Sequence, residues 1–371
     1  MWKMQADMGD TIFTPIYKVF DHYKPSADQG GITFKFFHKL TNVELAPDKK
    51  SVNRLHFDVQ AKVKDDKPYD PFVIVNKIPC WPNEPLYDQL VNGDELKKYN
   101  LESYWTPWKG KPLALEHGKD YDIVLLGTPV ATLPYLCSEL IDANPKWLRM
   151  LEKLQTTQTQ AYQLWLKPTL KELGWNDPSP VSTSYVEPVD TWAYLSPLII
   201  RETWPPGFEP GNIAYFCGVL KDATVIPPPS VHSFPAEQHQ RVKEHLTDYA
   251  NNNTGLLWPK ATNPANPKGL DFNVLIDLKN RQGQARLDSQ FWRANIDPSE
   301  RYTLTNVDSS RFRLDTDQTK DFGNLYIVGD WIQNNFNYGC IECCAMSGIL
   351  AARAITGEAI RMSAEKDVLL P

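Results

Sequence analysis

The sequence has no apolar run of the roughly 20 residues that a membrane-spanning helix needs. Its first residues, Met1–Asp10, show no basic segment followed by an apolar one, as a secretory leader would. Basic charge is also in short supply, since 39 Lys and Arg face 45 Asp and Glu and the formal net charge is −6. No broad basic surface is therefore expected that could bind a phosphate backbone. We expect a cytoplasmic protein without an integral membrane segment and without a nucleic-acid partner.

Motifs for metals and for nucleophilic catalysis are missing as well. Neither H-E-x-x-H nor G-x-S-x-G occurs, and the 7 histidines are scattered. Of the 6 cysteines, Cys80, Cys137 and Cys217 are isolated, whereas Cys340, Cys343 and Cys344 lie together in an apolar segment. No pair of C-x-x-C pairs and no secreted disulfide framework is present. We expect no metal site, and small buried cysteines in a reducing compartment.

The first part of the chain shows helical and then strand periodicity. Apolar residues at helical spacing from Ile12 to Phe20 predict a helix with Asp10 as its N-cap. Segment 32–43 reads as a strand, and alternating apolar residues from Leu55 to Val63 predict a second one in a hairpin or meander. The proline- and tryptophan-rich segment 64–119 is predicted to be an insertion.

Parallel-sheet features follow. The apolar run Tyr121–Leu126 is typical of a strand buried on both faces. Asn144 and Pro145 predict the start of a helix with Trp147, Leu148, Leu151 and Leu154 on one face. Strands are then expected over 157–166 and 213–220, and a helix that opens at Ser233 and Pro235. This mixture favours an α+β region between about residues 146 and 320.

The segment 324–331 predicts a buried strand that ends in Gly329 and Asp330. A polar loop leads to Gly339, and a helix is expected from about Cys340 to Thr356, with Gly357 closing it. In an open α/β sheet, ligands bind beyond the carboxyl ends of the strands, which is where Asp330 would lie. The free amides at the helix start suit a partial negative charge. An ordinary strand–loop–helix crossover explains these signals equally well.

A family resemblance adds to this picture. The run G-D-W-I-Q-N-N-F-N-Y-G-C-I-E-C-C-A-M-S-G, which starts at Gly329, resembles the carboxyl-terminal FAD motif of flavin-containing amine oxidases and phytoene desaturases. Cys343 and Cys344 replace the Gly-Ala usual in that family, and they keep these positions small. Two weaker matches extend the resemblance, namely Met8-Gly9-Asp10 and the strand that leads to Thr128-Pro129. The cofactor-binding residues that the resemblance implies are Gly9, Thr128, Pro129, Gly329, Asp330, Trp331, Gly339, Cys340 and Ile341.

The resemblance also implies a fold and an activity. The fold is an α/β FAD-binding domain of incomplete Rossmann-like type over 1–145 and 321–371, with an α+β substrate domain over 146–320. The activity is hydride transfer from a small organic substrate to flavin N5. Amine oxidases of the family hold a lysine near N5, and its position corresponds to Gln160. A glutamine carries no charge, which favours desaturation or another dehydrogenation over amine oxidation.

One feature of the family is missing. No G-x-G-x-x-G occurs in the 371 residues, so the amides that would bind the FAD pyrophosphate are lacking. We expect one half of a split flavoenzyme, completed by a second chain that supplies this segment, or else a truncated product. Two alternatives remain open. One is a non-catalytic relative that binds a partner, and the other is a binding protein for an apolar ligand. Trp165, Trp192, Tyr194 and Trp331 are candidates to line an apolar pocket, but most of them are expected to be core residues.

Overall fold

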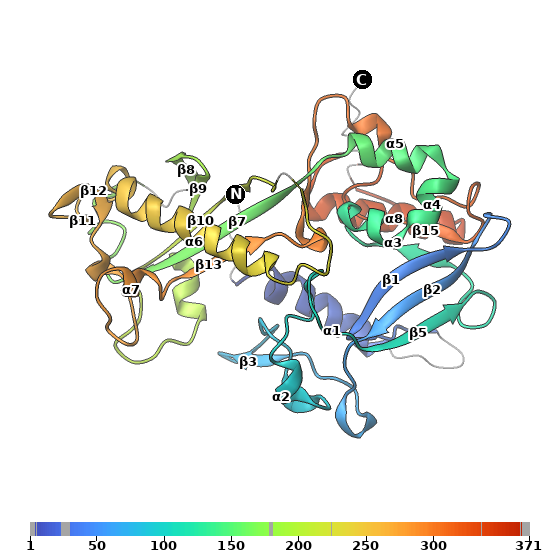
Figure 1. Ribbon diagram of the computed structural model, residues 1–371, viewed down its shortest axis with the longest axis horizontal. Helices are drawn as coiled ribbons and strands as arrows, with labels where there is room; N and C mark the ends of the chain where they lie inside the picture. Colours follow the sequence, from blue (N-terminus) through green and yellow to red (C-terminus); the bar gives the residue numbers. More distant parts are fainter. Residues whose placement is uncertain are drawn as a thin grey trace.

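The computed structural model describes residue 4 and residues 6–23, 30–177, 181–223, 225–334, 336–363 and 365. It is a mixed α/β structure with several separate sheets (Figure 1). The largest sheet and its helices form the left half of the view, with a separate two-stranded sheet at the far left, and the other sheets and helices form the right half and the base. Among the described residues, no helix combines the length and the apolar character needed to cross a membrane.

An antiparallel meander is built from the first three long strands. Strands β1 (His38–Leu45), β2 (Val52–Val59) and β5 (Lys111–Glu116) pair in the order β1-β2-β5. The meander expected from the alternating residues is confirmed, but β1 begins six residues later than the predicted start at Ile32. The predicted insertion also ends earlier, because β5 completes this sheet. What remains between β2 and β5 holds the hairpin of β3 (Val73–Val75) and β4 (Ile78–Cys80), together with α2 (Gly93–Leu96).

The amino-terminal helix is less buried than its periodicity suggests. It comprises a π-helical turn, η1 (Gly9–Phe13), and α1 (Thr14–His22). Asp10 is not the N-cap; its carboxylate accepts a hydrogen bond from Trp81 N at 3.0 Å, while Asp7 accepts from Asp10 N. Thr14 is the only buried residue of the described helix, and Phe13, Ile16 and Val19 are all exposed.

A short parallel pair joins distant parts of the chain. Strand β6 (Val124–Leu126) pairs with β15 (Leu325–Ile327), as the parallel-sheet signal predicted. Only one face is buried, however, because Leu125 is 50% exposed and Ile123 is 45% exposed. The prediction of a strand buried on both faces is therefore wrong for this chain as it stands. The helix α8 (Ile341–Thr356) follows β15, and Gly357 ends it in the left-handed conformation, as predicted.

Three further helices share one buried core with this pair. They are α3 (Leu133–Leu136), α4 (Ser138–Ala143) and α5 (Pro145–Lys153). Asn144 caps α5, since its side chain accepts from Lys146 N at 3.0 Å. Trp147 and Met150 are buried in one core with the β6–β15 pair, whereas Leu148 faces solvent, contrary to its predicted place on the packed face.

The large sheet has the strand order β13-β7-β10-β9-β8, with β14 also pairing with β7. All pairs in this sheet are antiparallel. The predicted strands 157–166 and 213–220 are confirmed as β7 and β10. The bounds are β7 (Thr156–Leu166), β8 (Val181–Val186), β9 (Val189–Tyr194), β10 (Asn212–Leu220), β13 (Phe291–Asn295) and β14 (Tyr302–Thr303).

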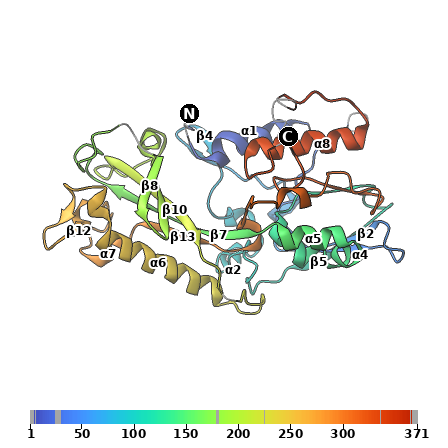
Figure 2. The same ribbon diagram turned by 90° about the horizontal axis from the view of Figure 1, so that it is seen from above.

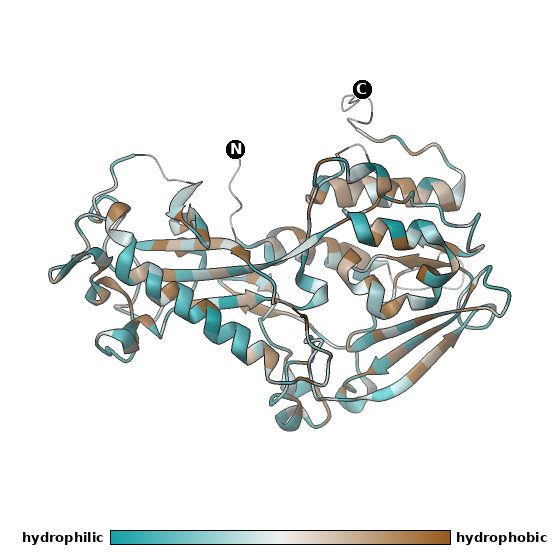
Figure 3. Cartoon of the chain, turned by 45° about the horizontal axis from the view of Figure 1, so that its top comes forward, coloured by the Kyte–Doolittle hydropathy of each residue, from teal (hydrophilic) through white to brown (hydrophobic). Residues whose placement is uncertain are grey.

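Helix α6 (Phe234–Asn252) lies along one face of this sheet, as Figure 2 shows. It begins at the position predicted from Ser233 and Pro235. Its side chains Val242, Leu246 and Tyr249 pack into the hydrophobic core of the large sheet, which is separate from the core of the β6–β15 pair. The small elements at its end are β11 (Thr262–Asn263), β12 (Asn266–Leu270) and α7 (Gln284–Leu287). In Figure 3 much of α6 is teal, whereas α8 is mostly white to brown. The domain limits 1–145, 146–320 and 321–371 stay a prediction.

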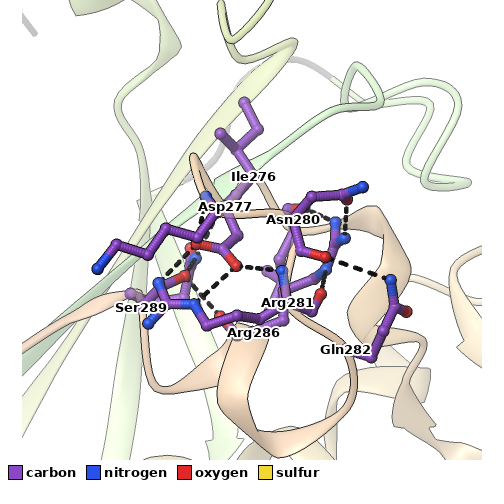
Figure 4. A network of polar contacts seen from close by, with 10 residues as sticks. Ile276, Asp277, Asn280, Arg281, Gln282, Arg286 and Ser289 are labelled. Atoms are coloured by element: carbon purple, nitrogen blue, oxygen red, sulfur yellow. Dashed lines mark hydrogen bonds and ion pairs between the residues drawn. The ribbon is translucent and has the colours of Figure 1, made fainter.

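A polar network fastens the loop before β13 (Figure 4). The Asp277 carboxylate accepts two hydrogen bonds from the Arg281 guanidinium, at 2.9 and 2.6 Å. The buried Arg286 donates to Leu275 O at 2.9 Å and to Arg281 O at 2.7 Å. These bonds satisfy charged groups that would otherwise be costly to bury.

Candidate functional site

The ends of the two parallel strands bring the predicted residues of both segments together. Val328 N donates to Leu126 O at 3.0 Å and continues the ladder beyond β15. The two loops that follow therefore start side by side. A Cβ on Gly127 would stand 3.1 Å from the side chain of Val328, so this approach favours a glycine.

Trp331 fastens these two loops to each other. Its indole Nε1 donates to Thr128 O at 3.0 Å, and its side chain is only 1% exposed. Gly329 has φ of +141°, and a Cβ there would lie 2.6 Å from the same Nε1. Both the conformation and the space therefore require glycine at this position. Trp331 is a core residue of this junction. Because its side chain is buried, only its backbone is accessible for the predicted contact with a cofactor.

The start of α8 faces the same junction. Gly329 N donates to the Ser347 hydroxyl at 3.0 Å, which holds the strand end against the helix. Cys340 is the N-cap of α8, and its Sγ accepts from Cys343 N at 3.3 Å. Within the described residues, the amides of Ile341 and Glu342 have no acceptor, as is usual in a first helical turn. They are donors available to a ligand.

Asp330 and Arg313 set the electrostatics of the junction. Burial raises the pKa of Asp330, and the positive charge of Arg313 counteracts that rise. The Arg313 side chain is 5% exposed, and its guanidinium donates to the backbone oxygen of Asp330 and, at 3.2 Å, to Thr305 Oγ1. Its Nε is buried without a partner among the described residues. Sequence reasoning missed Arg313, which stands outside every motif.

Gly339 lies opposite the Asp330 carboxylate. A Cβ on Gly339 would stand 3.2 Å from Asp330 Oδ2, so the loop passes close to this acidic group. The structure therefore brings Thr128, Gly329, Asp330 and Trp331 together with Gly339. Pro129, Cys340 and Ile341 are the chain neighbours of this group.

Gly9 and Gln160 have other surroundings. The nearest groups to a Cβ on Gly9 are the Asp7 carboxylate and the Trp81 ring. Gln160 is fully buried in β7, where its amide nitrogen donates to Val219 O at 2.9 Å. Its amide oxygen lies 2.8 Å from His245 Nδ1 of α6. Both ends of this amide are therefore engaged within the large sheet and its helix.

An aromatic cleft of about 590 Å³ lies between β13 and the segment that connects β2 to β5 and contains β4 and α2. Its volume is in the range typical of sites for small organic molecules. Its aromatic lining residues are Phe36, Phe37, Tyr69, Trp81, Tyr87, Tyr99, Phe291 and Trp292. Sequence reasoning missed this cleft, because its walls come from segments far apart in the chain.

Trp81 links the cleft to Gly9. Its ring contacts Tyr17 of α1 and Phe72 with centroid distances of 5.4 and 4.8 Å. Its backbone is held by Asp10, one residue after Gly9. Its indole nitrogen is buried without a partner among the described residues. Among the aromatics considered as pocket or core residues, Trp192 is fully buried in the core, as was expected for most of them.

Charged residues of both signs line the cleft, and two of them, Asp297 and Glu300, form a capping box just after β13. Burial raises the pKa of Asp297 to about 6, despite the hydrogen bond that its carboxylate accepts from Tyr104 N. Within the described part of the chain, no group of three or more His, Cys, Asp or Glu side chains is arranged to hold a metal ion.

Comparison with known proteins gives little further information. No protein-family model matches the chain, and no curated protein matches it either. Among solved structures, the crystal structure of an oxidoreductase from Methanosarcina mazei is similar, with 12% sequence identity and a TM-score of 0.39. The match covers 85% of this chain and 49% of that one, so the chain spans about half the length of that protein. At this level the similarity establishes neither a common fold nor a shared activity.

Proposed function

We propose that this chain is part of an FAD-dependent oxidoreductase of the amine oxidase and phytoene desaturase type. The observation that carries the proposal is the junction at the ends of β6 and β15. There Thr128, Gly329 and Asp330 lie together, and Gly329 N is bonded to Ser347 of α8. The same residues carry the sequence resemblance.

The donors and acceptors of the junction fit a flavin. The half-buried Asp330 carboxylate would accept hydrogen bonds from hydroxyl groups of the ribityl chain. The free amides of Ile341 and Glu342 would donate to the pyrimidine edge, where the helix dipole stabilises negative charge. The bound flavin would supply the hydride acceptor at N5. The protein would contribute orientation and exclusion of water.

A second chain would supply the pyrophosphate-binding segment that these residues lack. The uncovered face of the β6–β15 pair supports this view, because parallel strands are normally covered on both faces. Leu125 and Ile123 are exposed on β6 and beside it, and Ile341 is 41% exposed at the start of α8. A strand and a helix from a partner would bury these apolar side chains.

The organic substrate would bind in the aromatic cleft beside Trp81. Flat or apolar molecules would fit its aromatic walls, whereas the carboxylates of Asp297 and Glu300 are already engaged in their capping box. Gln160 offers no charge, and its amide is already bonded at both ends. Desaturation or another dehydrogenation therefore fits these residues better than amine oxidation does.

The proposal is tested by FAD retention in the chain co-expressed with its neighbouring reading frame. Asp330→Ala removes the acceptor for the ribityl hydroxyls, and we expect FAD affinity to fall about 10-fold or more. The control Asp142→Ala changes an exposed residue of α4 and should leave affinity unchanged. Equal FAD retention in wild type and Asp330→Ala would contradict the assigned role of Asp330.

A second candidate function is a truncated, non-catalytic relative that binds a partner or an apolar ligand without flavin. The cleft favours it, since its aromatic lining suits an apolar molecule whether or not a flavin is bound. In that case a hydrophobic dye such as anilinonaphthalene sulfonate would bind in the cleft, Phe291→Ala would weaken that binding, and no flavin would be retained under any condition.

A further inference from the structure

Two cysteines at the start of α8 lie close enough to each other to form a disulfide after a small movement. Cys340 and Cys343 are separated by two residues, and their sulfur atoms are 3.1 Å apart. Cys340 is the N-cap residue, and Cys343 lies in the first turn of a helix of 16 residues. A C-x-x-C pair at such a helix start is the usual arrangement of a redox-active dithiol.

The two thiols differ in access. Cys340 is partly exposed, whereas Cys343 is buried. Burial raises the pKa of Cys343 to about 12, and the hydrogen bond with Cys340 adds to this rise. Of these two sulfurs, that of Cys340 is therefore the one that an outside reactant can reach first. The third cysteine of the segment, Cys344, is exposed and follows Cys343 directly.

We propose that Cys340 and Cys343 form a reversible disulfide by exchange with a low-molecular-weight disulfide. The Cys340 thiolate attacks one sulfur of that disulfide, forms a mixed disulfide and releases one thiolate. Cys343 then loses its proton to solvent and attacks the Cys340 sulfur, which breaks the mixed disulfide and releases a second thiolate. In total, two protein thiols are oxidised and one external disulfide is reduced to two thiols.

The disulfide would restrict the loop that contains Gly339, and its formation would not require a bound flavin. Cys340 follows Gly339, which lies opposite the Asp330 carboxylate. A bond from Cys340 to Cys343 would fix this loop to the first turn of α8. The inference stands on the positions of the two sulfur atoms alone, so it holds or fails independently of the proposed function.

The test is oxidation of the reduced wild-type chain with oxidised glutathione. Two of the six free cysteines should disappear in a thiol count under denaturing conditions. After free thiols are blocked, cleavage following Glu342 separates Cys340 from Cys343. We expect the two resulting peptides to remain joined until a reductant is added.

Two variants locate the bond. Cys344→Ser should still give the joined peptides, which excludes a bond from Cys340 to Cys344. Cys343→Ser should stop at the glutathione adduct of Cys340. Six free thiols after oxidation, a persistent glutathione adduct in the wild type, or a disulfide between Cys343 and Cys344 would each overturn the proposal. These wild-type results decide the question even if Cys343→Ser fails to fold.

Discussion

The indole nitrogen of Trp331 donates a hydrogen bond to the carbonyl oxygen of Thr128, at a distance of 3.0 Å. The two residues are 203 positions apart in the sequence. Their bond joins the two loops that follow β6 and β15, which contain Thr128, Gly329 and Asp330. It also explains why Gly329 is a glycine, since any side chain there would meet the same indole.

Trp331→Phe should destabilise the chain more than Trp192→Phe does. Both tryptophans are fully buried, but only Trp331 loses a hydrogen bond, because the Trp192 nitrogen has no partner among the described residues. We expect an additional loss of about 1 kcal/mol in the free energy of unfolding for Trp331→Phe. Urea denaturation of both variants measures the difference, and equal losses would argue against this bond.

Gly329→Ala should cost about 3 kcal/mol of stability, because it adds backbone strain and a clash with a buried ring. The matched change Gly348→Ala lies within α8 in open space. It should stabilise the isolated chain by about 0.5–1 kcal/mol, as helical propensity predicts. If the two substitutions had similar effects in thermal or urea unfolding, the packing described at Gly329 would be incorrect.

Much of this junction could be predicted from sequence, because its signals are local. The strand, the helix from about Cys340 and the C-cap at Gly357 all follow from short-range patterns and are confirmed, although β15 ends at Ile327, before the predicted end at Gly329 and Asp330. The exposure of Leu125 could not be foreseen in this way. An apolar run indicates that a strand prefers burial, but it does not show whether a covering layer is present.

Acid should weaken the loop that Asp277 anchors. Two hydrogen bonds from Arg281 hold the pKa of Asp277 well below its usual range. In the unfolded chain the pKa would be about 3.9, so the stabilisation is complete above that pH and is lost as the pH falls below it. Asp277→Asn should therefore flatten the acid limb of stability measured between about pH 2 and pH 5. An unchanged acid limb would show that the Arg281 pair contributes nothing.

Asp297 should have the opposite dependence. Burial raises its pKa to about 6, so the folded chain binds a proton that the unfolded chain releases at about pH 4. The contribution to stability is full below the unfolded pKa and is lost as the pH rises through 6. Asp297→Asn should remove this loss in unfolding experiments from about pH 4 to pH 7. A variant with the wild-type slope would assign that dependence to another group.

The cleft and the roles of Arg313 and Asp297 could not be predicted from the sequence, because they depend on tertiary contacts. Asp297 accepts a hydrogen bond from Tyr104, which is 193 positions away, and Arg313 donates to the backbone of Asp330, which is 17 positions away. Gln160, the predicted lysine-equivalent position, is a second case in which sequence patterns did not reveal tertiary contacts. Its place in β7 was correctly expected, but its bond with His245 of α6 depends on tertiary packing.

The visible absorbance between about 350 and 500 nm tests the central claim most directly, because bound flavin absorbs there. It is measured on this chain purified alone and again after co-expression with its neighbouring reading frame. We predict flavin bands only in the co-expressed sample. Stoichiometric FAD in the chain alone would contradict the need for a second chain, and no flavin in either sample would contradict the assignment as a flavoenzyme.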